Sequence, residues 1–191
     1  MEPNDDSTPP LNSSEASEPI IPPRGPGTSD GASASRRLAK ELRDYHRLQD
    51  SATESEQPLG YILEPKGDDI FLWKGTVIGP LGSPYAGGLF FFDISLPTDY
   101  PFKPPAVALA TRMYHPILTV GQKVCMSFLC DDQWSPATTI MRVMEAIIQD
   151  FMININPDTS HIHNMEAATY FKNDRLKFDQ VARDWTQRFA L

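Results

Sequence analysis

The 191-residue sequence has few cysteines, no excess of basic residues and no long apolar run. Its two cysteines, Cys125 and Cys130, are too few for a disulfide framework, and no Cys/His cluster has zinc-finger spacing. A formal net charge of −8 argues against a strongly basic nucleic-acid-binding protein. The apolar runs fall far short of the roughly 20 residues of a membrane-spanning helix. We therefore expect no metal site, no nucleic-acid partner and no membrane association.

Two further absences bear on compartment and on phosphate chemistry. The first residues lack the positive and apolar regions of a secretory signal, and the low cysteine content suits a reducing compartment. The expected location is therefore the cytoplasm, the nucleus or both. The glycines around Gly79–Gly82 lack a lysine in register, so they do not form a phosphate-binding loop.

The N-terminal segment differs in composition from the rest of the chain. Residues 1–34 carry seven of the 18 prolines, no aromatic residue, six acidic residues and one basic residue. This segment accounts for −5 of the net charge and leaves −3 for the remainder. The composition predicts a disordered acidic tail over residues 1–34, followed by one folded domain over residues 35–191. The tail is either a passive leader, which the composition favours, or a docking segment.

The folded part is predicted to begin with an amphipathic helix. Leu38, Leu42 and Tyr45 are spaced by four and three residues, and Ser33 or Ser35 is a candidate N-cap. The face opposite the leucines is basic and consists of Arg36, Lys40, Arg43 and Arg47. That face is either simply solvated or a docking surface for a partner. The polar stretch Gln49–Gln57 is predicted to be a loop.

The remaining pattern predicts an α+β fold. Four apolar segments separated by turns predict an antiparallel meander over residues 61–63, 71–78, 89–96 and 106–110. Beyond residue 136 the apolar spacing becomes helical and predicts helices over residues 140–151, 165–171 and 178–189. Strands followed by helices, rather than strands alternating with helices, are typical of the α+β class.

Cys125 lies in a long segment without clear periodicity, residues 113–134. A lone intracellular cysteine is a candidate nucleophile, although an inert buried thiol is the commoner case. His115 is a candidate base or a structural hydrogen-bonding residue. His161 and His163 lack a third ligand for a metal. A redox pair of Cys125 and Cys130 is a weaker alternative, because their spacing is not that of a CxxC motif.

Several short motifs occur in a distinctive order: Tyr85–Gly88, Tyr100–Pro105, Tyr114–Pro116, Cys125, Trp134–Ala137 and Ala182–Thr186. In this order they resemble the catalytic core of ubiquitin-conjugating enzymes over about residues 34–191. The stress-type members that work with RING ligases are the most similar. The resemblance implies an N-terminal helix, a four-stranded antiparallel meander and C-terminal helices.

The resemblance also implies an acyl transferase that acts through a cysteine thioester. Ubiquitin would arrive from an activating enzyme on Cys125 and pass to a lysine of a substrate protein, or to a ligase cysteine. ATP is consumed by the activating enzyme, so no cofactor is implied, and a monomer is expected. Arg36, Arg37 and Lys40 match the positions that meet the activating enzyme. The positions that bind the ligase are matched by Phe102, Pro136 and Ala137, and His115 matches a mainly structural histidine.

Three departures from the family pattern lie near the chemistry. The asparagine expected after His-Pro is Ile117, with Thr119 as the nearest hydroxyl, and the aspartate expected after the cysteine is Ser127. The gate segment carries Thr159 in place of an aspartate, although Asp158 remains. Because an isoleucine cannot donate a hydrogen bond to an oxyanion, we expect charging of Cys125 to survive better than discharge to lysine. Two alternatives stay open: a non-catalytic module that sequesters ligases or ubiquitin, and a carrier of another ubiquitin-like modifier.

Overall fold

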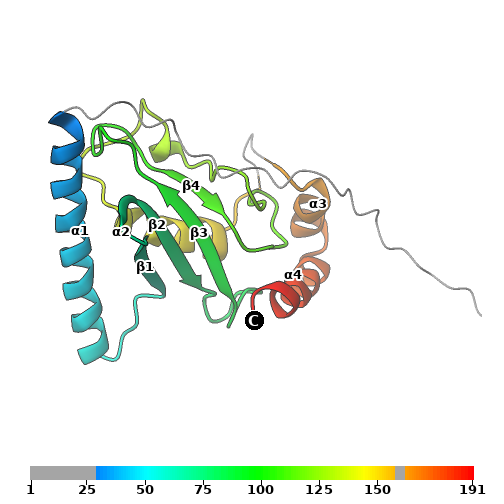
Figure 1. Cartoon of the computed structure of the whole chain (residues 1–191). Helices are drawn as coiled ribbons and strands as arrows, with labels where there is room; N and C mark the ends of the chain where they lie inside the picture. The colour runs from blue at the N-terminus through cyan, green and yellow to red at the C-terminus, as the bar shows by residue number, and fades with distance from the viewer. Residues whose placement is uncertain (1–28, 158–161) are drawn as a thin grey trace, which may run out of the picture.

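A long N-terminal helix, a four-stranded sheet and C-terminal helices follow one another along the chain in this computed structural model, which describes residues 29–157 and 162–191 (Figure 1). The elements are α1 (Ser29–Glu54), β1 (Tyr61–Lys66), β2 (Asp69–Ile78), β3 (Leu89–Ser95), β4 (Ala106–Leu109), the 3₁₀ helix η1 (Ser127–Leu129), α2 (Ile140–Ala146), the π-helical continuation η2 (Ile147–Ile153), α3 (Met165–Asn173) and α4 (Arg175–Phe189). This arrangement confirms the predicted α+β class. Of the segment predicted to be disordered, residues 1–34, residues 1–28 lie outside the described residues. For residues 29–34 the prediction is wrong, because they form the first part of α1.

The first helix is longer than predicted at both ends. It begins at Ser29 rather than near Ser35, and it continues through most of the predicted loop to Glu54. Ala34 is completely buried and Ala52 is 9% exposed, so small apolar residues extend the buried stripe beyond the leucines in both directions. The predicted cap at Ser35 is wrong, because its hydroxyl donates to the carbonyl of Gly31 within the helix.

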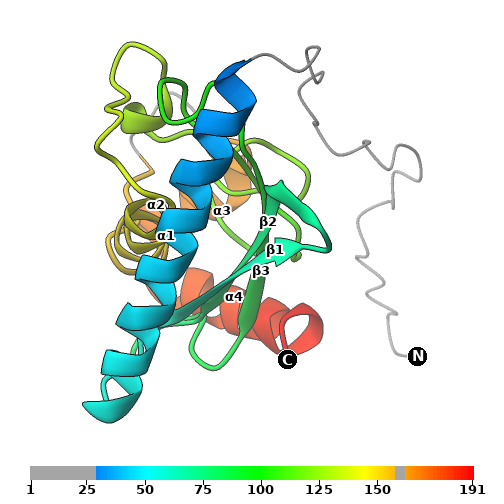
Figure 2. The ribbon, with the colours of Figure 1, turned by 60° about the vertical axis from the view of Figure 1, so that its left-hand side comes forward.

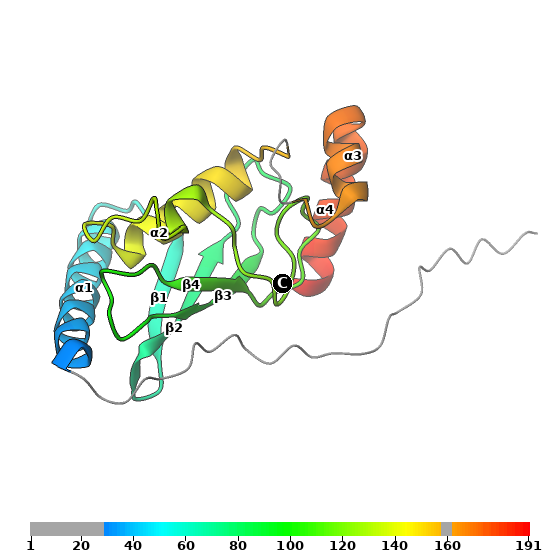
Figure 3. The ribbon, with the colours of Figure 1, turned by 90° about the horizontal axis from the view of Figure 1, so that it is seen from above.

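The sheet is the predicted antiparallel meander in the order β1-β2-β3-β4. A tight turn joins β1 to β2 and contains Gly67, whose φ of 58° favours glycine. One face of the sheet is covered by α2, as Figure 3 shows. The approach is close at Gly75, where a Cβ atom would lie 2.8 Å from the sulfur of Met144. Gly75 therefore allows α2 to pack onto the middle of the sheet.

The helices flank the two ends of the sheet. α1 lies across one end and contacts β2, whereas α3 and α4 lie at the opposite end (Figures 1 and 2). Asn164 caps α3 and Asp174 caps α4, each by accepting a hydrogen bond from a backbone N–H in the first turn. α4 begins at Arg175, three residues before the predicted start. In the described parts of the chain, no helix has both the length and the apolar character needed to cross a membrane.

The long segment between β4 and α2 is irregular in backbone but well anchored. Val124 donates a backbone hydrogen bond of 2.7 Å to Val107 of β4, and Lys123 and Val120 form isolated bridges to the same strand. The side chains of Leu118, Val124, Met126 and Leu129 are buried in the core. Tertiary packing therefore gives this segment a defined path, although its sequence has no regular periodicity.

Candidate active site

Cys125 is presented at the surface by buried neighbours on both sides. Val124 is 2% exposed and Met126 is 7% exposed, whereas Cys125 itself is exposed. The alternation places the thiol outward, and its Sγ lies 3.6 Å from the carbonyl of Lys123. The interpretation of Cys125 as an inert buried thiol is therefore wrong. Its exposure meets the first requirement for a nucleophile that has to reach a large protein substrate.

The thiol lies in an open groove of about 980 Å³. The segment that carries Cys125 and η1 forms one wall of this groove. The C-terminal part of η2 and the residues after it form the other wall, with Asp150, Phe151, Asn154 and Asn156.

His115 is completely buried and holds the chain that leads to the groove. Its Nδ1 accepts hydrogen bonds from the backbone N–H groups of Ile117 and Leu118, at 3.0 and 2.9 Å. Its Nε2 therefore carries the proton and donates to the carbonyl of Phe151 at 2.9 Å. Burial lowers the pKa of His115 to about 3. With both nitrogens engaged and no access to the groove, His115 has the structural role and not that of a base.

Ile117, two residues after His115, occupies the position where the resemblance leads us to expect an asparagine. Its side chain is 6% exposed and lines the groove, so this part of the wall is apolar. Thr119 is exposed, but it does not belong to the described residues that line the groove. The structure therefore brings Ile117 to Cys125 and leaves Thr119 aside. Ser127, the first residue of η1 and two residues after Cys125, also lines the groove.

Asp158 and Thr159 of the predicted gate lie outside the described residues, as does His161. Asn156, two residues before Asp158, lies within them and lines the groove. The described part of the gate segment therefore reaches Cys125, which is consistent with a role for this segment near the thiol.

The basic residues of α1 are not equivalent. Arg36 and Lys40 are exposed, and Lys40 forms an ion pair with Asp44 at 2.7 Å. Arg37 instead turns toward the protein and pairs with the buried carboxylate of Glu41 at 2.6 Å. Although partial burial of Arg37 opposes it, the hydrogen bond that Arg37 donates to the Glu41 carboxylate raises the pKa of this guanidinium. Arg36 and Lys40 are therefore open to a partner, whereas Arg37 is bound within the fold.

The residues expected to meet a ligase lie on two neighbouring loops. Phe102 is 75% exposed on the turn after Tyr100, and Pro136 and Ala137 are exposed on the loop before α2. The indole N–H of Trp134 joins these loops by donating to the carbonyl of Pro101 at 2.6 Å. The structure thus brings Phe102, Pro136 and Ala137 onto two loops that this hydrogen bond joins.

Two other chemical interpretations of these residues are a redox pair of Cys125 and Cys130 and a metal site. Both cysteines are free, and Cys130 contacts the carbonyl of Met126 at 3.7 Å. Among the described residues, no group of three His, Cys, Asp or Glu side chains could hold a metal ion.

Sequence reasoning missed several residues of the site. Asp131, Asp132, Asp150 and Asn154 line the groove, yet no motif marks them. Glu41 was also missed, although it had a signal: it lies three residues after Leu38, within the apolar stripe of α1. A carboxylate at such a position either reaches water because the helix is rotated about its axis, or is buried and accepts hydrogen bonds from donors of the protein.

The comparisons with known proteins agree with this geometry. A family model described as "Ubiquitin-conjugating enzyme" matches residues 37–186. Among solved structures, the chain is similar to the E2 domain of a ubiquitin conjugating enzyme from Toxoplasma gondii. That likeness has 33% sequence identity and a TM-score of 0.66, and it covers 82% of this chain and 99% of the other.

Proposed function

Because the chain belongs to the ubiquitin-conjugating enzyme family and has its fold, we propose that Cys125 carries ubiquitin as a thioester and passes it to lysines of substrate proteins with a RING-type ligase. The observation that carries this proposal is the exposed thiol in an open groove, held between the buried side chains of Val124 and Met126. The family implies interactions with ubiquitin, an activating enzyme and ligases in general.

The chemistry is two successive acyl transfers. The Cys125 thiolate attacks the thioester carbonyl on the activating enzyme, a new C–S bond forms, and the activating enzyme's cysteine leaves as a thiolate. A substrate amine then attacks the Cys125 thioester, a C–N bond forms, and the Cys125 thiolate leaves while the amine proton passes to solvent. This scheme needs no cofactor on the chain, because ATP is consumed by the activating enzyme.

The partner surfaces follow from the same proposal. Arg36 and Lys40 on the exposed face of α1 would meet the activating enzyme. Arg37 would contribute indirectly, through its ion pair with Glu41 inside the fold. Phe102, Pro136 and Ala137 would contact the ligase. An exposed aromatic ring beside exposed proline and alanine is the kind of surface that supplies a binding hot spot.

Ile117 supports a second function, that of a binding module without catalysis. Its apolar side chain lines the groove beside Cys125, where the family asparagine would supply an amide donor. Loss of one oxyanion donor costs roughly 10²–10³ in rate, so discharge could be too slow to matter while the partner surfaces persist. The exposed Cys125 thiol favours the carrier over this alternative.

The test is charging of Cys125. The full chain is incubated with ubiquitin, ATP and a ubiquitin-activating enzyme and analysed on a gel with and without thiol. We expect an adduct that thiol removes, and a thiol-resistant ester in Cys125→Ser, because an oxygen ester resists thiol exchange. Absence of any adduct, under conditions that charge a known relative, would reject the carrier in favour of the binding module. A parallel incubation with another ubiquitin-like modifier and its own activating enzyme distinguishes the modifier.

A further inference from the structure

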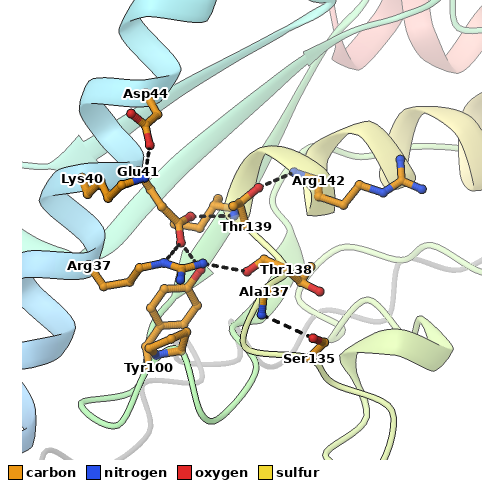
Figure 4. A network of polar contacts seen from close by, with 12 residues as sticks. Arg37, Lys40, Glu41, Asp44, Tyr100, Ser135, Ala137, Thr138, Thr139 and Arg142 are labelled. Atoms are coloured by element: carbon orange, nitrogen blue, oxygen red, sulfur yellow. Dashed lines mark hydrogen bonds and ion pairs between the residues drawn. The ribbon is translucent and has the colours of Figure 1, made fainter.

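The carboxylate of Glu41 is the centre of a buried polar network on α1 (Figure 4). Its Oε1 accepts from the guanidinium of Arg37 at 2.6 Å and from the hydroxyl of Tyr100 at 2.7 Å. Its Oε2 accepts from the backbone N–H of Ile140 at 2.9 Å. Both oxygens are therefore bound, and only 3% of the residue is exposed.

The three donors come from three different parts of the chain. Arg37 lies one turn earlier on α1, Tyr100 begins the turn that carries Phe102, and Ile140 is the first residue of α2. The loop with Pro136 and Ala137 ends directly at Ile140. Arg37 also donates to the carbonyl of Thr138 in this loop, at 3.3 Å. The network thus binds both ligase-facing loops to α1 and so to each other.

The three donors occupy both oxygens of the Glu41 carboxylate. Burial and the neighbouring Glu41 carboxylate raise the pKa of Tyr100 well above its usual value, so its hydroxyl stays protonated and donates. A buried carboxylate that lost a donor would keep an uncompensated charge, and a donor that lost the carboxylate would stay buried and unpaired. The two loops therefore have one favourable position relative to α1.

We propose that Glu41 is a positioning residue, which sets the spacing between Phe102 on one loop and Pro136 and Ala137 on the other. The proposal rests on the proposed function for the nature of the partner, a RING-type ligase. Its basis is separate: the buried carboxylate accepts hydrogen bonds from Tyr100 and Ile140, one at each ligase-facing loop. It also accepts from Arg37, which itself donates to the carbonyl of Thr138. A surface fixed in advance binds more tightly, because less ordering is needed on association.

The variant is Glu41→Gln, which keeps the shape but replaces one accepting oxygen by a donating NH₂ group. The matched control is Glu145→Gln on α2, since Glu145 makes an exposed ion pair with Arg142 at 3.4 Å. Tyr100→Phe is a second variant, which removes one hydroxyl donor and leaves the ring and the carboxylate in place. Tyr100→Phe therefore still tests the proposal if Glu41→Gln fails to fold.

Three measurements are made on the full chain. Amide hydrogen exchange reports opening of residues 100–103 and 135–140 relative to the sheet. Titration with the isolated RING domain of a ligase that stimulates discharge of the charged wild type gives the dissociation constant. The third measurement is the rate of Cys125 charging. For Glu41→Gln we expect faster exchange in both loops and about tenfold weaker RING binding, the scale of a lost hydrogen bond to a charged group. Charging should be affected less than RING binding, because the exposed Arg36 and Lys40 keep their places on α1.

Tyr100→Phe should show a smaller effect in the same direction, chiefly over residues 100–103, and Glu145→Gln should match the wild type. The proposal is overturned if both loops of the folded Glu41→Gln and Tyr100→Phe variants exchange as in the wild type, or if RING affinity equals that of the control. A wild type that is not charged rejects the proposed function instead, and hydrogen exchange still decides the positioning role. Loosened loops with slower charging but unchanged RING affinity would also contradict the proposal.

Discussion

Burial and two backbone donors leave His115 without a role in proton transfer. The sequence alone could not separate a base from a structural residue, because both need a histidine near the nucleophile. The structure separates the two roles, because the N–H groups of Ile117 and Leu118 donate to Nδ1 and the carbonyl of Phe151 accepts a hydrogen bond from Nε2–H.

The lowered pKa of His115 predicts a pH-dependent stability. With a pKa of about 3 when folded and about 6.5 when unfolded, the unfolded chain binds more protons between these values. The contribution of neutral His115 to the free energy of unfolding is fully present above pH 6.5. It decreases as the pH falls below this value, by about 1.4 kcal/mol per pH unit. Urea unfolding of wild type and His115→Asn at pH 7 and pH 5.5 measures the slope, and the variant should show a shallower one.

The asparagine in that variant keeps an acceptor near the position of Nδ1 but cannot titrate. His46→Gln is the control, because His46 is exposed on α1 and should leave the slope unchanged. Equal slopes in wild type and His115→Asn would contradict the assigned protonation state.

Ile117 gives the residue-scale prediction on activity. We expect Ile117→Asn to speed discharge of the Cys125 thioester to free lysine by about 10- to 100-fold, because an amide donor returns beside the reacting carbonyl. Since Ile117 is 6% exposed, the same change should lower stability by about 1–3 kcal/mol. Single-turnover discharge after removal of the activating enzyme measures the first effect, and urea unfolding the second.

Ile117→Val is the matched control, as it alters the side chain without adding a donor. Identical discharge rates in wild type, Ile117→Val and Ile117→Asn would show that the missing asparagine does not limit transfer.

At the scale of elements, the ligase-facing surface depends on two loops rather than on a helix or strand. The turn after Tyr100 and the loop before α2 are separated by more than thirty residues and meet through Trp134 and Pro101. The prolines of Tyr100–Pro105 therefore belong to the connection between β3 and β4.

Phe102→Ala tests this surface directly. The ring is 75% exposed, so we expect little loss of stability, unchanged charging of Cys125 and at least tenfold weaker binding of a RING domain. The control is Leu176→Ala on α4, whose side chain is 84% exposed at the far end of the molecule. RING binding of Phe102→Ala equal to that of the control would remove Phe102 from the ligase surface.

At the scale of the whole molecule, charge is unevenly distributed. The net charge of −8 lies mainly in the N-terminal segment, and −3 remains for residues 36–191. Within this weakly acidic part, Arg36 and Lys40 stand on the exposed side of α1, at the opposite end of the sheet from α4 (Figure 1).

We expect Arg36→Glu to slow charging by the activating enzyme, and more strongly at low than at high salt, because exposed charges are screened by salt. The control is Arg188→Glu in the last turn of α4, which makes the same change in net charge away from α1. Charging rates at two salt concentrations measure the effect. Equal slowing in both variants would mean that net charge, and not the face of α1, governs the encounter.

Apolar spacing along the chain was enough to predict the meander and the helices after residue 136, because these depend on neighbours a few residues apart. Cys125 was singled out as the reactive residue by the order of the short motifs around it, which resembles the family. The ends of α1 were beyond such reasoning, since the buried Ala34 and Ala52 are compatible with either state. Packing between distant segments placed the second wall of the groove, including Asn156, beside Cys125. It also turned Arg37 inward onto Glu41, because a buried carboxylate finds its donors wherever the fold brings them.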